Sequence, residues 1–207
     1  MSKAKEKFDK TLARCNEMVN LYNKLKIKGD IPPQDVLRGA IVLAVAAFDA
    51  YATDCFSEHF IDYIKRNKID DSIIALLTDA GFDLRFALEL INTERPYRKI
   101  RTLIDKHYSK YTTQKIKVID DLYKLFHLSK ITHNAAKKAG KKPENLLKSV
   151  EKLVERRHCI VHDGDYNDHN RITNVTERDI KRIASLKVLV NNMELIIENK
   201  FARGKEK

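Results

Sequence analysis

The chain has 207 residues, which suits one domain with a substantial hydrophobic core, and it carries a formal net charge of +11 with 33% of its residues charged. Its 6 glycines and 4 prolines are too few for the many tight turns of a β-sandwich or β-barrel, so helices are favoured. The three cysteines, Cys15, Cys55 and Cys159, are widely spaced and form no Cys-x-x-Cys pair, which argues against a disulfide framework and a zinc ribbon and fits a reducing cytoplasm.

The first predicted helix covers residues 3–26. Apolar residues recur there in alternating steps of four and three from Phe8 to Tyr22, which is the stripe of an amphipathic helix. Its polar start, MSKAKEKFDK, lacks the apolar core of a secretory signal, so we expect none. The sequence Lys28-Gly29-Asp30 ends the helix.

A second and longer helix is predicted from Pro32-Pro33 to Arg66, because proline is tolerated in the first turn and good helix formers follow. Its middle, AIVLAVAAFDAYA, is apolar on nearly every side, as expected of a helix that neighbours bury all round. The most apolar stretch, residues 39–52, is shorter than the roughly 20 residues of a membrane-spanning helix and contains Asp49. We therefore expect a central core helix of a soluble protein.

Shorter helices are predicted next, at residues 70–77 and 82–91 with Gly81 between them, at 96–108 and at 113–126. The lysine-rich segment HNAAKKAGKKP that follows, residues 133–143, is predicted to be a basic loop.

The last part of the chain predicts two long helices. Apolar residues from Leu146 to Val154 mark a helix that runs into ERRHCIVH, and the polar loop DGDYNDHNRITN stops it. Thr176 and Asp179 resemble a capping box, and an apolar stripe to Ile197 marks the final helix. We expect residues 202–207 to fray, and the whole to be an all-α bundle.

The segment Arg157-His158-Cys159-Ile160-Val161-His162 carries the chemistry that the sequence suggests most strongly. On a helix, His158 and His162 lie one turn apart on the same face, and Arg157 lies about 140° round from His162. An RNA phosphate could meet both Arg157 and His162. Histidine exchanges protons near neutral pH, and a guanidinium can hold two phosphate oxygens as charge builds, so a metal ion is not needed.

Here the chain resembles the HEPN superfamily, whose motif is an Arg, usually followed by a polar residue, and a His after four to six intervening residues. Arg157, His158 and His162 supply these elements at the end of a helix. The long early helix with a leading Arg and an embedded acid, with the late motif and an Ile-Thr loop, is similar to the RiboL-PSP-HEPN branch. The resemblance covers the second helix and roughly residues 145–201.

The resemblance implies an all-α bundle with a long central helix, in a single domain of residues 1–207 with a helical insertion at 70–132. It also implies metal-independent cleavage of RNA that leaves a 2′,3′-cyclic phosphate and a 5′-OH, in a site that two copies of the chain share. The settings that it implies are toxin–antitoxin systems and phage defence, in the cytoplasm, with an antitoxin or regulatory protein as a further partner. No cofactor is implied.

Structural interpretations compete with this one. Arg157 and His162 can simply terminate a helix, since cations are favourable at a helix C-terminus. His158 is a candidate second acid or base, a guide for its neighbour, or a polar residue at a dimer seam. Asp49 must have a partner if it is buried: it either orients Arg157 or His162 or pairs with another base such as Arg38, three turns away on the same face. Arg38 has the same two roles open, with the structural one favoured.

Three metal-binding patterns are weak. One is a cluster of His158, His162 and His169 with Asp163 and Asp165, and another is the doublet His162-Asp163, which lacks the further ligands of a phosphohydrolase. The loop 163–174 departs from a calcium loop at its glycine and closing glutamate positions. We therefore predict no metal ligands and a solvated polar loop.

Basic residues form two candidate RNA-binding surfaces, because lysines and arginines track phosphates and bases stack on tyrosines. The first interleaves cations with tyrosines over residues 95–117 and includes Arg98 and Arg101; the second consists of Lys137, Lys138, Lys141 and Lys142. A solvated helix face explains either surface as well. The functional alternatives are therefore an RNA-cleaving enzyme, a helical module that binds RNA or a nucleotide without cleaving, and a metal-dependent hydrolase.

Overall fold

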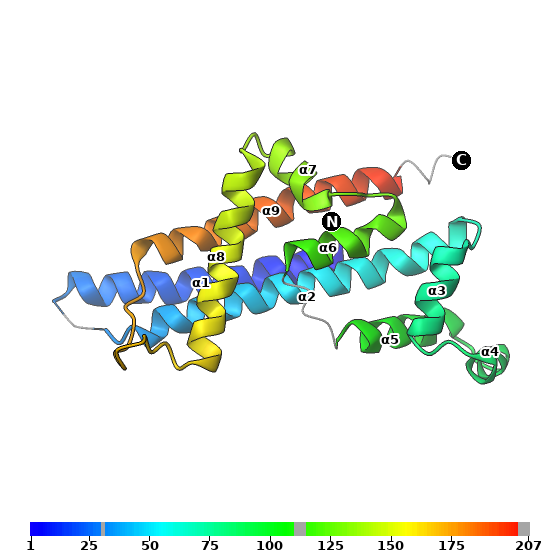
Figure 1. The fold of residues 1–207 in the computed structure, drawn as a ribbon, viewed down its shortest axis with the longest axis horizontal. Coiled ribbons are helices and arrows are strands. Elements are labelled where there is room, and N and C mark those ends of the chain that lie inside the picture. Colours follow the sequence, from blue (N-terminus) through cyan, green and yellow to red (C-terminus); the bar gives the residue numbers. More distant parts are fainter. Residues whose placement is uncertain (30–31, 110–114, 203–207) are drawn as a thin grey trace.

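A computed structural model of the protein describes residues 1–29, 32–109 and 115–202. These residues form nine α-helices and one short 3-10 helix, and the only β-type pairing among them is a single bridge between Tyr166 and Ile172. The predicted all-α fold is confirmed (Figure 1).

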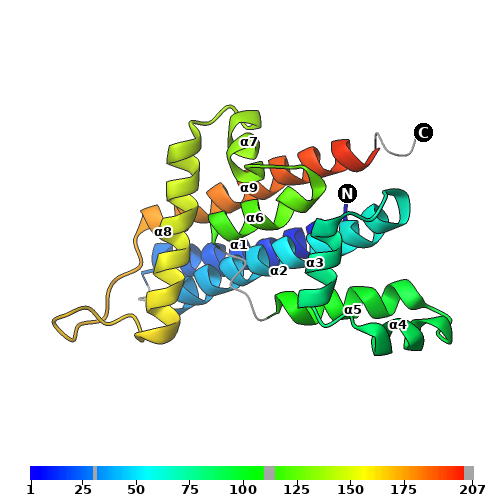
Figure 2. The ribbon, with the colours of Figure 1, turned by 45° about the vertical axis from the view of Figure 1, so that its right-hand side comes forward.

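Helices α1 (Lys3–Ile27) and α2 (Asp35–Arg66) lie side by side as a long antiparallel pair (Figures 1 and 2). The predicted stripe of α1 faces α2, with Phe8 buried and Tyr22 packed against the core, and Gly29 turns the chain with a φ of 86°. Asp30 lies outside the described residues.

Helix α2 is the centre of the bundle and contacts α1, α5, α8 and α9. From the sequence, the apolar stretch 39–52 looked too short to span a membrane. The 32-residue helix that contains it is, however, long and apolar enough to do so by length and composition. Of its most apolar window, 56% is buried by the rest of the chain, as in the core helix of a soluble protein.

Helices α3 (Asp71–Asp79), α4 (Leu84–Ile91) and α5 (Pro96–Tyr108) confirm three of the predicted short helices. Gly81 separates the first two with a φ of 97°, and Pro96 occupies the first turn of α5. Helix α5 packs against α2, whereas α4 lies at the outer edge of the molecule (Figure 2). Whether residues 70–132 are an insertion stays a prediction.

The next segment contains the largest error of the sequence analysis. Helix α6 (Ile116–Tyr123) and the 3-10 helix (Lys124–Phe126) agree with prediction, although Thr113 lies outside the described residues. The predicted basic loop, however, is largely helix α7 (Ile131–Lys138). Ile131, Ala135 and Ala136 are buried at helical spacing against neighbouring helices, and the lysines follow at the exposed end, so packing decides where composition suggested a loop.

Helix α8 (Pro143–His162) crosses α9 and the α1–α2 pair in both views, and α9 (Glu177–Ala202) returns along the bundle (Figures 1 and 2). The predicted capping box is present: the Asp179 carboxylate accepts from the Thr176 N–H at 2.9 Å, and the Thr176 hydroxyl accepts from the Asp179 N–H at 3.2 Å. Residues 203–207 of the predicted frayed tail lie outside the described residues.

Candidate functional site

The Arg-x4-His motif occupies the last turns of α8. Leu146, Val150 and Leu153 are buried and hold the helix against its neighbours, while His158 and His162 are exposed near and at its end. As expected from the helical period, these two imidazoles meet: their ring centroids are 4.4 Å apart and the ring planes lie at 37°.

Arg157 lies beside this pair in sequence and is half-buried. Its Nε is buried without a hydrogen-bond partner, and no ion pair within the described part of the chain reaches its guanidinium. Its two terminal nitrogens are not buried and make no hydrogen bond within the described residues, so they are the donors open to an external acceptor. Phosphate oxygens are the acceptors that match their geometry. The end of α8 therefore offers one cation and two imidazoles to an anionic ligand.

The neighbouring Arg156 has the opposite environment. Its Nη1 and Nη2 both donate to the Asp165 carboxylate, the second at 2.8 Å, and Nη2 also donates to the Thr173 carbonyl at 3.1 Å. Arg38, at the start of α2, donates from Nε to Asp165 at 2.6 Å and from Nη2 to the Thr173 carbonyl at 2.8 Å. Two arginines from different helices thus share one carboxylate and one carbonyl of the α8–α9 loop.

Asp165 is 1% exposed and is the centre of this ion cluster, which we define as Arg38, Arg156 and Asp165. Its backbone has a left-handed φ of 64°, its N–H donates to the Cys159 carbonyl at 3.0 Å, and its own carbonyl accepts from the Thr173 N–H at 2.8 Å. Burial disfavours the charged form of Arg38, but its hydrogen bonds to Asp165 and Asp35 outweigh that effect and raise its pKa.

The cluster extends to α9, because Arg156 Nε lies 3.9 Å from the Asp179 carboxylate and Arg182 donates to the same carboxylate at 2.5 Å. The ends of α2, α8 and α9 are therefore joined around the loop that follows His162. The prediction of a solvated polar loop is wrong at Asp165, which is buried, and correct for its exposed neighbours such as Asp168.

The structure does not bring the other supporting candidates to the motif. Arg38 pairs with Asp35 and Asp165 instead of Asp49. Asp49 is half-buried on α2, and no hydrogen bond or ion pair joins it to Arg38, Arg157 or His162, all of which are described. Its interaction lies elsewhere.

The two basic surfaces are also apart from the motif. The four lysines from Lys137 to Lys142 are exposed around the N-terminal end of α8, the opposite end from His162. On α5, Arg101 faces Glu58 at 3.6 Å and Asp105 at 3.8 Å, whereas Arg98 has no ion-pair partner in the described ranges. Tyr97 is exposed, and Tyr108 packs edge-on against Phe56 with centroids 5.2 Å apart.

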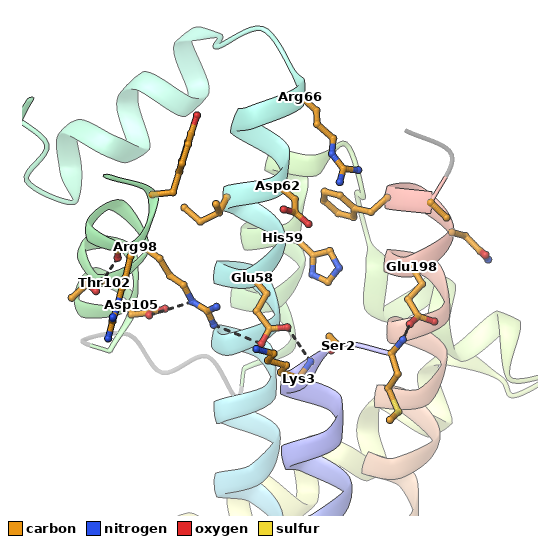
Figure 3. Close-up of a pocket in the computed structure, with 17 residues that line it drawn as sticks. Ser2, Lys3, Glu58, His59, Asp62, Arg66, Arg98, Thr102, Asp105 and Glu198 are labelled. Atoms are coloured by element: carbon orange, nitrogen blue, oxygen red, sulfur yellow. Dashed lines mark hydrogen bonds and ion pairs between the residues drawn. The ribbon is translucent and has the colours of Figure 1, made fainter. Parts of the chain in front are cut away.

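An open groove of 1120 Å³ lies between α2, α5 and α9 at the N-terminal end of α1 (Figure 3). It contains Arg98 and Arg101 but neither Arg157 nor His162. Much of its charge is internally paired: Arg101 faces Glu58 and Asp105. Glu58, labelled in Figure 3, also accepts a hydrogen bond from the Lys3 N–H at 3.1 Å. The Arg157–His162 motif is therefore on an exposed helix end and not in this groove.

Exposed apolar side chains flank the motif. Val161 on α8 and Tyr166 and Ile172 on the following loop are all about half exposed.

Sequence reasoning missed Arg156 and Asp165. Arg156 is adjacent to an arginine that matched a motif, although neighbours on a helix point about 100° apart and so face different surroundings. Asp165 stands among polar residues, and its partner Arg38 is 127 residues away, so only the tertiary fold joins them. The one signal in the sequence was Arg38 at the start of α2, directly before its apolar middle.

Comparison with protein-family models matches residues 9–199 to the family described as RiboL-PSP-HEPN, which leaves out only eight residues at each end of the chain. No curated protein and no solved structure gives a significant match.

Proposed function

Because this chain belongs to the RiboL-PSP-HEPN family, we propose that it is an endoribonuclease that cleaves RNA without a metal ion, with Arg157 and His162 as its catalytic residues. HEPN proteins include many ribonucleases, and the finer assignment to these two residues is ours.

The contrast between two adjacent arginines carries the proposal. Arg156 donates its hydrogen bonds to Asp165 and Thr173. Arg157 has no partner within the described part of the chain, and it lies in the last turns of α8 with exposed His162. An arginine that only terminated the helix would gain from binding the last carbonyls or an acid. Unsatisfied donors on the same helix end as an exposed histidine fit a binding site for phosphate.

In the proposed reaction the ribose 2′-oxygen attacks the adjacent phosphorus as the bond to the 5′-oxygen breaks, which gives a 2′,3′-cyclic phosphate and a 5′-OH. A neutral His162 takes the 2′-OH proton, and a protonated imidazole gives one to the leaving oxygen. Arg157 binds the non-bridging oxygens as negative charge increases on them. Water is not consumed in this step, and no redox change occurs.

We propose that a homodimer supplies the second catalytic imidazole. His158 lies beside His162 in the same chain, but only His162 is the histidine of the family motif. The reaction needs a base and an acid, and these two roles fit the two copies of that motif. The exposed side chains of Val161, Tyr166 and Ile172 beside the motif support an interface there, because association would bury them. Arg98 and the lysines from Lys137 to Lys142 are further proposed RNA contacts.

The test is cleavage of total RNA by the purified chain in EDTA, with His162→Ala and Arg157→Ala compared with the parent. Matched controls are His169→Ala and Arg171→Ala, which remove an exposed histidine and an exposed arginine from the nearby loop. We expect the first pair to lose at least about a hundredfold in rate and the controls to stay near parental rates.

Equal cleavage by the parent and His162→Ala would remove His162 from the mechanism, and loss of activity in EDTA would show a metal-dependent hydrolase. RNA binding without cleavage would identify a binding module of the same family. Growth arrest on expression in bacteria that His162→Ala relieves is the outcome expected for the proposed setting, a toxin or phage-defence protein acting in the cytoplasm.

A further inference from the structure

His158 and His162 have the arrangement of a helical metal chelate. They lie one turn apart on α8, both are exposed, and their ring centroids are 4.4 Å apart. Neither ring makes a hydrogen bond or ion pair with any residue in the described ranges, so their nitrogen lone pairs are open to an external ligand. Two histidines at this spacing on one helix face are the recurring helical element of zinc sites.

We propose that His158 and His162 bind a divalent transition-metal ion, with Zn²⁺ as the best match, and that the bound ion inhibits the chemistry assigned to His162. Imidazole nitrogens suit Zn²⁺, Ni²⁺ and Cu²⁺ far better than Mg²⁺ or Ca²⁺. Zn–N bonds of about 2.0–2.1 Å place two nitrogens of a tetrahedral ion about 3.3 Å apart. The ring centroids are 4.4 Å apart, and rotation of the two side chains would bring one nitrogen of each to that spacing.

The position on the helix favours a cation. His162 is the last residue of α8, where the helix dipole places partial negative charge, and the Asp163 carboxylate follows it at the surface. Arg157 opposes binding as a nearby positive charge. A helix end also fixes the spacing of the two rings in advance, which lowers the entropy cost of chelation.

The site differs from a structural or catalytic zinc centre. No group of three or more potential ligands occurs within the described parts of the chain, so water completes the coordination in one copy. Such a site exchanges its metal readily. In the proposed dimer, two such pairs brought together supply four imidazoles, which is the number that a tetrahedral Zn²⁺ site takes.

Zinc is expected to inhibit cleavage because it occupies the nitrogen lone pair that His162 uses to accept a proton. A His162 nitrogen that binds Zn²⁺ cannot accept the 2′-OH proton, and a metal on the ring also prevents it from acting as the acid. This part rests on the proposed function, whereas the binding of the ion does not. EDTA is then expected to raise the cleavage rate of protein that carries zinc.

Zinc binding is tested by calorimetry with ZnCl₂ on the full chain without a histidine tag. We expect saturable binding, weakened at least about tenfold by His158→Ala and by His162→Ala. His169→Ala removes an exposed histidine outside the pair, and Cys159→Ser removes the thiol that follows His158 in the sequence; both should stay within about twofold of the parent. Zn²⁺ should also raise the thermal midpoint of the parent and of both controls, but not of the two pair variants.

Binding that survives His158→Ala, or that Cys159→Ser abolishes, would overturn the proposed ligands, and absence of saturable binding would overturn the site. Zinc binding with no RNA cleavage under any condition would support the site and refute the proposed function. Cleavage in EDTA that micromolar Zn²⁺ does not slow would refute the inhibition.

Discussion

Replacing Asp165 by asparagine removes the negative charge that Arg38 and Arg156 share. The side-chain shape stays, and asparagine tolerates the left-handed backbone at this position. One carbonyl oxygen remains to accept hydrogen bonds, but the new amide places N–H donors against guanidinium donors. Both arginine side chains are nearly buried, at 11% and 12% exposure, so water replaces the lost partner poorly.

Breaking a buried ion pair by removing one partner costs about 3–5 kcal/mol, and the remaining acceptor of asparagine recovers part of that. We therefore expect Asp165→Asn to lower the free energy of unfolding by about 2–4 kcal/mol. For a chain of this size the thermal midpoint should fall by about 5–15 °C. Asp165→Ala should cost about 1 kcal/mol more, because alanine adopts a left-handed φ less readily.

Circular dichroism at 222 nm during heating and in urea measures both quantities. The matched control is Asp168→Ala, an exposed aspartate of the same loop, whose midpoint should stay within about 1–2 °C of the parent. If Asp165→Asn and Asp168→Ala melt alike, the ion cluster does not stabilise the end of α8, and the explanation for the position of the motif is wrong.

Three further predictions concern buried side chains. Burial raises the pKa of the Cys15 thiol to about 11 and of the Cys55 thiol to about 12. In the native protein at pH 8, therefore, Cys159 should react with DTNB while the other two cysteines react only in denaturant. Rapid reaction of all three thiols in the native protein would contradict this. Ala136→Asp should lower stability by about 3 kcal/mol or more in urea unfolding, since it buries a carboxylate in the α7 interface, and an unchanged midpoint would argue that α7 does not pack there. Glu194 is 4% exposed and accepts hydrogen bonds from Ser2 and from the Tyr51 hydroxyl, so Glu194→Gln should cost about 1–3 kcal/mol by the same measurement.

The helices that sequence reasoning placed well have local causes. Helix α1 has an uninterrupted apolar stripe, and α5 has a proline in its first turn, so periodicity and backbone chemistry predict them without tertiary information. Helix α7 has no such stripe of large residues. Two alanines and Ile131 are buried there by α8 and α9, and a lysine-rich composition does not reveal that contact.

The candidate site also has one feature that the sequence predicts and one that only the tertiary fold determines. The pairing of His158 with His162 follows from the helical period alone, and the structure confirms that they meet. The separation of roles between Arg156 and Arg157 does not follow from sequence, because it depends on where Arg38 and Asp165 lie after folding. A short motif thus predicts which residue types gather, and the ion cluster determines which of two arginines remains available.

Helix α8 fixes the distance between the lysines at its start and the histidine at its end. Lys142 caps the 20-residue helix and His162 is its last residue, so the two lie about 30 Å apart at 1.5 Å per residue. Fields from exposed charges fade over about 8 Å at physiological salt, so the lysines exert little influence on a phosphate at the histidine. If RNA is the substrate, as proposed, a strand long enough to span the helix would contact both ends, whereas a dinucleotide would contact only one. The length of the substrate would then determine how much of this protein's positive charge it meets.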